Sequence, residues 1–237
     1  GTALLVTQLL TVTGYISFDD HRLLASDLPI AAILVGGVMF GIGMVLTRGC
    51  ISRLSVLTGS GNLRALTVLV VFAILAHATL KGILAPLRVW LGSVTLPMGE
   101  VSSLAGLPGG AAVWAVLLAL ICFALAARSG VAWSKALWAG LLGLLVPAGW
   151  LGTGFVLQDE FDPILMQSLS FTAPAADLLF WTVASSAIPA GFGVGLILGV
   201  VLGAAAASLS KGEFHWQSFD TPKQTGRYFL GAALMGV

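Results

Sequence analysis

Residues 28–47 read LPIAAILVGGVMFGIGMVLT, with no Asp, Glu, Lys or Arg among them. At 1.5 Å per residue, an α-helix of these 20 residues spans about 30 Å, the thickness of the hydrocarbon core of a bilayer. The run ends at Arg48, Gly49 and Cys50, a charge followed by a glycine and a thiol. The stretch therefore predicts a membrane-spanning helix that breaks at a glycine-cysteine pair.

The composition of the whole chain is also that of a membrane protein. Of the 237 residues, 58% are hydrophobic and 9% are charged, whereas about 25% are charged in soluble domains. A net charge of +1 leaves no basic surface for nucleic acid, and two cysteines make neither a zinc-ligand cluster nor a disulfide framework. We therefore expect an all-α, polytopic helical membrane protein that binds no nucleic acid.

Other apolar runs predict further spans. A span within 176–208 is expected to be kinked or divided at Pro189, and a seventh opens at about Tyr228 and is cut off by the end of the chain. Segment 85–108 is expected to be an outer loop with at most a short re-entrant piece. The remaining predicted spans lie at about 1–17, 62–84, 109–127 and 133–157.

Basic residues are distributed unevenly between the two sides of this array. Segments 48–64, 128–135 and 209–227 carry eight basic and two acidic residues, while the opposite loops carry three basic and eight acidic ones. Because Lys and Arg are retained on the cytoplasmic side, these three segments are predicted to face the cytoplasm.

The residues after the break restart a helix. Ser52 or Ser55 is a candidate N-cap of a short half-helix, and Asn62 is a candidate N-cap of the next span. Half-helices of this kind leave backbone N–H groups and a positive dipole end available to an anion. Cys50 is then open to two interpretations, a small apolar filler or a contact to an anion or soft sulfur ligand.

Three further features have a structural and a functional interpretation. His77 lies four residues before Lys81 on one helix face, and it either lines a transport pathway or bonds a neighbouring carbonyl. Cys122 has no polar neighbour in sequence and is predicted to be packing. Small-residue spacing predicts close helix packing at Gly37 and Gly41, and along Gly191, Gly195, Gly199 and Gly203.

An internal echo links the two ends of the chain. Residues 36–41 read GGVMFG and residues 231–236 read GAALMG. We interpret the pair as a sign of two pseudo-repeated halves with broken or re-entrant half-helices. One transmembrane domain over 1–237 would then contain a first half at about 1–127 and a truncated second half at about 133–237. The partner of Cys50 would fall at about position 245, beyond Val237.

Four blocks of the chain resemble a known family. The runs GVMFGIGMVL at 37–46, Gly49-Cys50, and GNLRAL at 61–66 are similar to the first-half signature of the YeeE/YedE sulfur-transport family, and 231–236 resembles the lead-in to its second-half cysteine motif. The family's other cysteines are absent from this chain. Thr47, Arg48 and Arg53 also stand where small or apolar residues are usual.

The resemblance implies a multi-pass protein of the bacterial inner membrane. It implies thiosulfate uptake through a central pathway, in which cysteines on short helices pass the dianion along by S–H hydrogen bonds. We expect thiosulfate or a related small sulfur-containing anion as the substrate. The candidate substrate-binding residues are Cys50, Gly49, Arg48, Gly61, Asn62 and His77.

An alternative function is a membrane-embedded binding or relay subunit that passes sulfur or selenium species to a cytoplasmic sulfurtransferase-like partner. The sequence contains no Ser/His/Asp set, no metal-ligand cluster and no nucleotide-binding loop. We therefore expect neither enzyme activity nor a metal or other cofactor.

Overall fold

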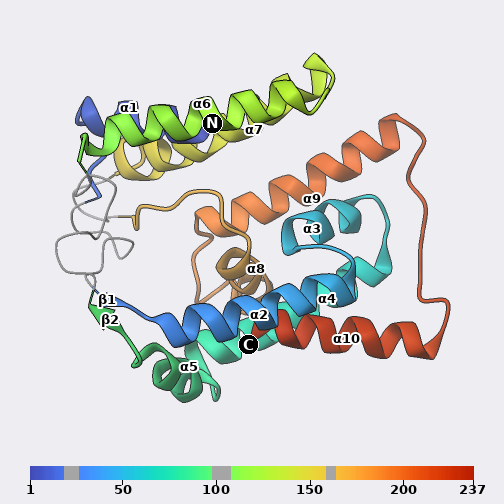
Figure 1. The fold of residues 1–237 in the computed structure, drawn as a ribbon. Helices are drawn as coiled ribbons and strands as arrows, with labels where there is room; N and C mark the ends of the chain where they lie inside the picture. Colours follow the sequence, from blue (N-terminus) through green and yellow to red (C-terminus); the bar gives the residue numbers. More distant parts are fainter. Residues whose placement is uncertain (19–26, 98–107, 159–163) are drawn as a thin grey trace. The chain divides into compact units, whose positions relative to one another are not determined.

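The computed structural model describes residues 1–18, 27–97, 108–158 and 164–237. Over these residues the chain is mostly helical with almost no strand (Figure 1), which confirms the predicted all-α class. It forms two compact units, each assembled from two separate stretches of sequence. The first comprises Gly1–Leu28 and Leu96–Leu169, and the second comprises Pro29–Thr95 and Ser170–Val237.

In the first unit, helix α1 packs on α6 and α7. Thr2 contributes to this packing, because its Oγ1 donates a hydrogen bond of 3.1 Å to the carbonyl of Gly140 on α7. The elements are α1 (Thr2–Val12), α6 (Gly110–Arg128), α7 (Trp133–Leu151), the π-helical turn η3 (Gly152–Val156), and the two-residue antiparallel strands β1 (Asp27–Leu28) and β2 (Leu96–Pro97).

The second unit contains the break predicted after residue 47. In Figure 1, α10 lies along α2 and α4, and α3 turns back beside α9. The helices are α2 (Ile30–Thr47), α3 (Ile51–Gly59), α4 (Leu63–Lys81), α5 (Ala85–Gly92), α8 (Thr172–Ala184), α9 (Phe192–Ser210) and α10 (Pro222–Gly236).

Five helical stretches of the described chain are long and apolar enough to cross a membrane. They are Ile30–Gly59, Leu63–Lys81, Gly110–Arg128, Trp133–Val156 and Phe192–Ser210. Leu63–Lys81, Gly110–Arg128 and Trp133–Val156 match predicted spans to within a few residues. Ile30–Gly59 contains the span predicted at 28–47 and continues past the break into α3. The span predicted within 176–208 is divided. Helix α8 ends at Ala184 and α9 begins at Phe192, so the break contains Pro189 as expected.

Two of the predicted spans differ from the structure. Helix α1 ends at Val12 and not near residue 17, because the chain turns at Gly14, whose φ is +78°. Helix α10 begins at Pro222, six residues before the predicted start at Tyr228. Its first turns are polar, so hydropathy alone does not detect them. Thr221 nevertheless caps this end by accepting a hydrogen bond from Gln224 N.

The core of the second unit joins α3, α4, α8 and α10. Phe72 of α4 is completely buried at its centre, and the half-helix α3 contributes Ile51 and Leu54, each 1% exposed. Tyr228 and Met235 of α10 belong to the same cluster. The half-helix is therefore anchored by its own apolar face, which holds the break after residue 47 in one place.

The glycines that bring helices together are different from those predicted. A Cβ on Gly43 would lie 2.5 Å from Met235 Cγ and 2.7 Å from Gly231 O, so α2 and α10 are in backbone contact there. Gly37 and Gly41 face open space in the described structure, as do the stripe glycines Gly191, Gly195, Gly199 and Gly203. The predicted packing at these positions is wrong because helical spacing shows which residues share a face, not which face has a neighbour.

Cys122 also differs from the prediction. It was expected to be packing, but its side chain is exposed on α6. An apolar neighbourhood in sequence does not distinguish a lipid-facing position from a packed one, because both surroundings are apolar.

We expect Gly43→Ala to destabilise the second unit by about 1–3 kcal/mol, the cost of adding a methyl group to a closed contact. The measurement is the thermal unfolding midpoint of the purified protein in detergent. Gly41→Ala is the matched control, because a Cβ on Gly41 meets nothing within 4 Å. Equal midpoints for the two variants would show that α2 and α10 do not touch at Gly43.

Candidate functional site

The turn between α2 and α3 is closed by a left-handed residue. Arg48 has φ 60° and ψ 27°, the only positive φ at a non-glycine residue in the described chain. Its N–H bonds Val45 O at 3.4 Å, and the N–H of Gly49 bonds Met44 O at 3.0 Å. This is the Schellman pattern, in which glycine is usual at the position that Arg48 occupies.

Thr47 holds the same turn from inside. The residue is 1% exposed, and its Oγ1 lies 2.9 Å from Gly43 O and 3.0 Å from Gly49 O. A buried hydroxyl needs partners of this kind. Thr47, which departs from the small or apolar residues usual at this position in the family, thus supports the turn that presents Gly49 and Cys50.

The left-handed turn leads to a stability prediction. Arg48→Gly should stabilise the protein by about 1 kcal/mol, because glycine adopts a positive φ without the Cβ strain of arginine. Unfolding midpoints in detergent measure this. Arg53→Gly, the same substitution in the exposed interior of α3, should have the opposite sign and cost about 1 kcal/mol. Two shifts of the same sign would contradict the assigned turn.

Cys50 is the N-cap residue of α3. It has extended backbone (φ −79°, ψ 169°), its side chain is half-buried, and its Sγ lies 3.0 Å from Ser52 Oγ. No side-chain hydrogen bond caps the helix. The N–H groups of the first turn have no acceptor within the helix either, so they form a positive end beside the thiol.

The predicted serine caps of this half-helix are wrong. Ser52 contacts Cys50, and Ser55 is fully buried and donates to Ile51 O at 2.9 Å. The helix starts one residue before Ser52 because Gly49 and Arg48 complete the preceding turn first. A Cβ at position 49 would lie 3.1 Å from Arg53 Cδ, so the lack of a side chain on Gly49 leaves room for the Arg53 side chain.

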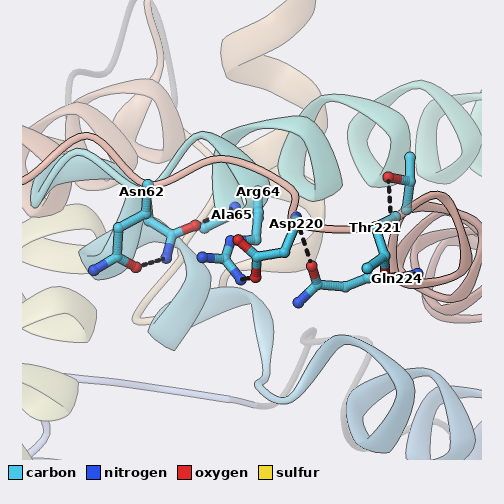
Figure 2. Close-up of polar contacts among 8 residues, drawn as sticks. Asn62, Arg64, Ala65, Asp220, Thr221 and Gln224 are labelled. Carbon is cyan, nitrogen blue, oxygen red and sulfur yellow. Dashed lines mark hydrogen bonds and ion pairs between the residues drawn. The ribbon is translucent and has the colours of Figure 1, made fainter.

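The other end of α3 turns at Gly61 and Asn62. Asn62 caps α4 as predicted, by accepting a hydrogen bond from Ala65 N at 3.0 Å (Figure 2). Its Nδ2 donates to Gln217 Oε1 at 2.8 Å. Gly61 has φ +95°, and a Cβ there would lie 2.6 Å from His215 O. Both residues therefore join the turn to the segment after α9.

His77 lies far from these two turns. At 1.5 Å per residue it is about 20 Å along α4 from Asn62. Its ring stacks on Phe180 of α8, with centroids 3.5 Å apart and planes at 22°. The six candidate residues thus fall into three places in the second unit: the turn 48–50, the turn 61–62, and the α4–α8 contact.

The segments 48–64 and 209–227, predicted to face the same side, do meet within the second unit. Arg64 Nη1 and Asp220 Oδ2 form an ion pair of 3.1 Å (Figure 2), and Arg227 Nε donates to Leu46 O at 3.2 Å. Within this unit, the end of α2, the start of α4 and the start of α10 therefore lie close together.

A basic cavity lies where α2 ends and α10 begins. It has a volume of about 380 Å³. Sequence reasoning placed Arg48 at the site but missed Lys223, Arg227 and Tyr228, although the charge distribution had put their segment on the same side. The lining residues are Arg48, Asp220, Thr221, Lys223, Gln224, Arg227 and Tyr228.

Comparison with known proteins bears on this architecture. No curated protein matches the chain closely enough to count as a relative. The family model described as sulphur transport matches residues 1–237, the whole chain. It represents the family that the blocks around Cys50 resemble. With its long apolar helices and the helix break at Cys50, this chain belongs to the sulphur transport family and is a multi-pass membrane protein that transports a sulfur compound.

Proposed function

We propose that this transporter takes up thiosulfate, or a closely related small sulfur oxyanion, across the bacterial inner membrane, with Cys50 as a contact to the passing anion. The observation that carries the proposal is the position of Cys50. The thiol stands at the N-terminus of a half-helix, inside the apolar stretch Ile30–Gly59.

The chemistry of this position suits a sulfur dianion. A thiol donates a hydrogen bond through S–H, and the amides of the first turn of α3 supply further donors and a positive dipole end. A terminal sulfur or an oxygen of thiosulfate accepts such bonds without any change in oxidation state. No covalent bond forms or breaks, so the anion is free to move on.

The three groups of candidate residues have different roles in this proposal. Cys50 and Gly49 contact the anion, since Gly49 carries no side chain beside the thiol. Arg48 supplies positive charge at the basic end of the same turn. We retain Gly61, Asn62 and His77 as candidates, although each also has a packing role that explains it: a backbone approach, a helix cap and a ring stack.

The test is uptake by a bacterium that lacks its own thiosulfate transport. Cells that express the complete reading frame should grow on thiosulfate as the sole sulfur source and accumulate ³⁵S-thiosulfate, and cells with an empty vector should not. Growth of both on cysteine controls for viability. Correctly inserted protein without any accumulation would exclude thiosulfate uptake. If the protein then copurified with a soluble sulfurtransferase-like protein, the relay function would replace it.

A further inference from the structure

We infer that the cavity between the end of α2 and the start of α10 binds a small tetrahedral oxyanion group, held by Arg48, Lys223, Arg227 and the hydroxyl of Tyr228. The inference rests on the proposed function only for the identity of the natural anion, a sulfur oxyanion at one end of its path. The site itself follows from the charges and the geometry of the cavity.

The charges around the cavity do not cancel. Three cations and one acid line it, and the acid, Asp220, is already paired with Arg64 at 3.1 Å. Arg48 and Lys223 form no ion pair with any residue that the structure describes. The cavity is therefore positive overall, and an anion that enters it gains attraction without displacing an existing partner.

Arg227 is held so that it can serve a ligand. Its Nε donates to Leu46 O at 3.2 Å, at the C-terminal end of α2, where a helix leaves carbonyls without partners. This bond orients the guanidinium group and leaves both terminal nitrogens as donors. A planar pair of donors suits two oxygens of one oxyanion.

Tyr228 adds a neutral hydrogen-bond donor to the lining of the cavity. The residue is 7% exposed and lines the cavity, and its ring packs edge-on against Phe219 with centroids 5.8 Å apart. Its hydroxyl forms no hydrogen bond with a residue that the structure describes, and it is not among the buried polar atoms without a partner, so solvent in the cavity reaches it. The hydroxyl is therefore available to donate to an oxyanion in the cavity.

The start of α10 reinforces the preference for an anion. Thr221 accepts from Gln224 N at 3.3 Å, and the Gln224 side chain accepts from Asp220 N at 3.0 Å (Figure 2), so the first turn is ordered. The positive end of the helix dipole adds to the charge of Lys223 and Arg227. Arg48, which lines the cavity, is two residues before Cys50, the proposed contact to the transported anion.

Direct binding tests the site. The full transporter, purified in an uncharged detergent, is titrated with ³⁵S-thiosulfate and with ³²P-phosphate. We expect Arg227→Gln and Lys223→Gln each to weaken binding at least tenfold, and Tyr228→Phe to weaken it three- to tenfold. Lys211→Gln, which removes an exposed cation at the end of α9 outside the cavity, should stay within twofold of the parent. Affinity should also fall as the salt concentration rises.

A second arm separates a dissolved anion from the phosphate of a lipid headgroup. The titrations are repeated in nanodiscs of phosphatidylcholine with and without phosphatidylglycerol. Displacement of the label by phosphatidylglycerol in the parent, but not in the cavity variants, makes the headgroup the occupant. Persistent binding makes it the dissolved anion. Both results support an oxyanion site.

Other results overturn the inference. The site is excluded if neither labelled anion binds the parent at millimolar concentration. It is also excluded if the three cavity variants bind as tightly as the parent. Uptake by the parent separates this failure from that of the proposed function. If the parent takes up thiosulfate but the variants bind the anion unchanged, only the cavity site is refuted. If the variants weaken binding but the parent takes up no thiosulfate, only the proposed thiosulfate transport is refuted.

Discussion

Uptake of ³⁵S-thiosulfate should fall about ten- to a hundredfold when Cys50 is replaced by alanine. A hydrogen bond to a charged partner contributes about 1.5–3 kcal/mol, and each 1.4 kcal/mol is a factor of ten. The alanine variant loses the S–H donor of a half-buried side chain at the start of α3. It loses no helix cap, because no side-chain hydrogen bond caps α3, so the amount of inserted protein should be unchanged.

Two further substitutions make this result specific. Cys122→Ala removes the other thiol of the chain, which is exposed on α6, and should leave uptake unchanged. Cys50→Ser keeps a donor and adds a good N-cap, so it should retain partial uptake while raising the stability of α3 by about 1 kcal/mol. Uptake at the parent rate by Cys50→Ala, at an equal amount of protein in the membrane, would remove Cys50 from the pathway.

The largest structural effect is expected for Gly61→Ala, with a loss of about 3 kcal/mol of stability. Gly61 has φ +95°, which strains any residue with a Cβ by about 1–2 kcal/mol, and that Cβ would lie 2.6 Å from His215 O. The segment after α9 would have to move, which disturbs the backbone bonds from Gln217 N to Gly61 O at 3.1 Å and from Leu63 N to Gln217 O at 2.8 Å. Unfolding midpoints and protease resistance in detergent measure the loss.

Two glycine variants separate strain from steric contact. Gly212 has φ +68° with nothing within 4 Å of a Cβ, so Gly212→Ala should show only the strain of about 1 kcal/mol. Gly36 lies inside α2 with open space around it, so Gly36→Ala should be neutral or stabilising. If Gly61→Ala kept full stability but lost uptake, Gly61 would be a substrate contact and not a structural glycine.

Features set by neighbours in sequence were predicted from the sequence. The apolar runs located five membrane-length helices because lipid requires a continuous apolar stretch whose backbone bonds close within it. The cap of α4 by Asn62 and the division near Pro189 are equally local, since a cap needs a residue three positions on and proline acts on its own turn.

Features that depend on which helix faces were in contact were not predicted. The small-residue pattern of α2 includes Gly37, Gly41 and Gly43, and only the position of α10 selects Gly43 as the point of contact. The start of α3 at Ile51, and not after Ser52 or Ser55, follows from the left-handed turn at Arg48, which hydropathy does not report. The proposed repeat of two halves remains a prediction.

Apolar length and a glycine-cysteine pair were sufficient to recognise a helical membrane protein and the break at Cys50, because each depends on residues close together in the chain. The tertiary structure alone brings Arg48 to Lys223, Arg227 and Tyr228, more than 170 positions later, and separates His77 from both turns. These arrangements depend on how α2, α4 and α10 pack, and such packing arises from contacts between distant side chains, which local sequence patterns do not specify.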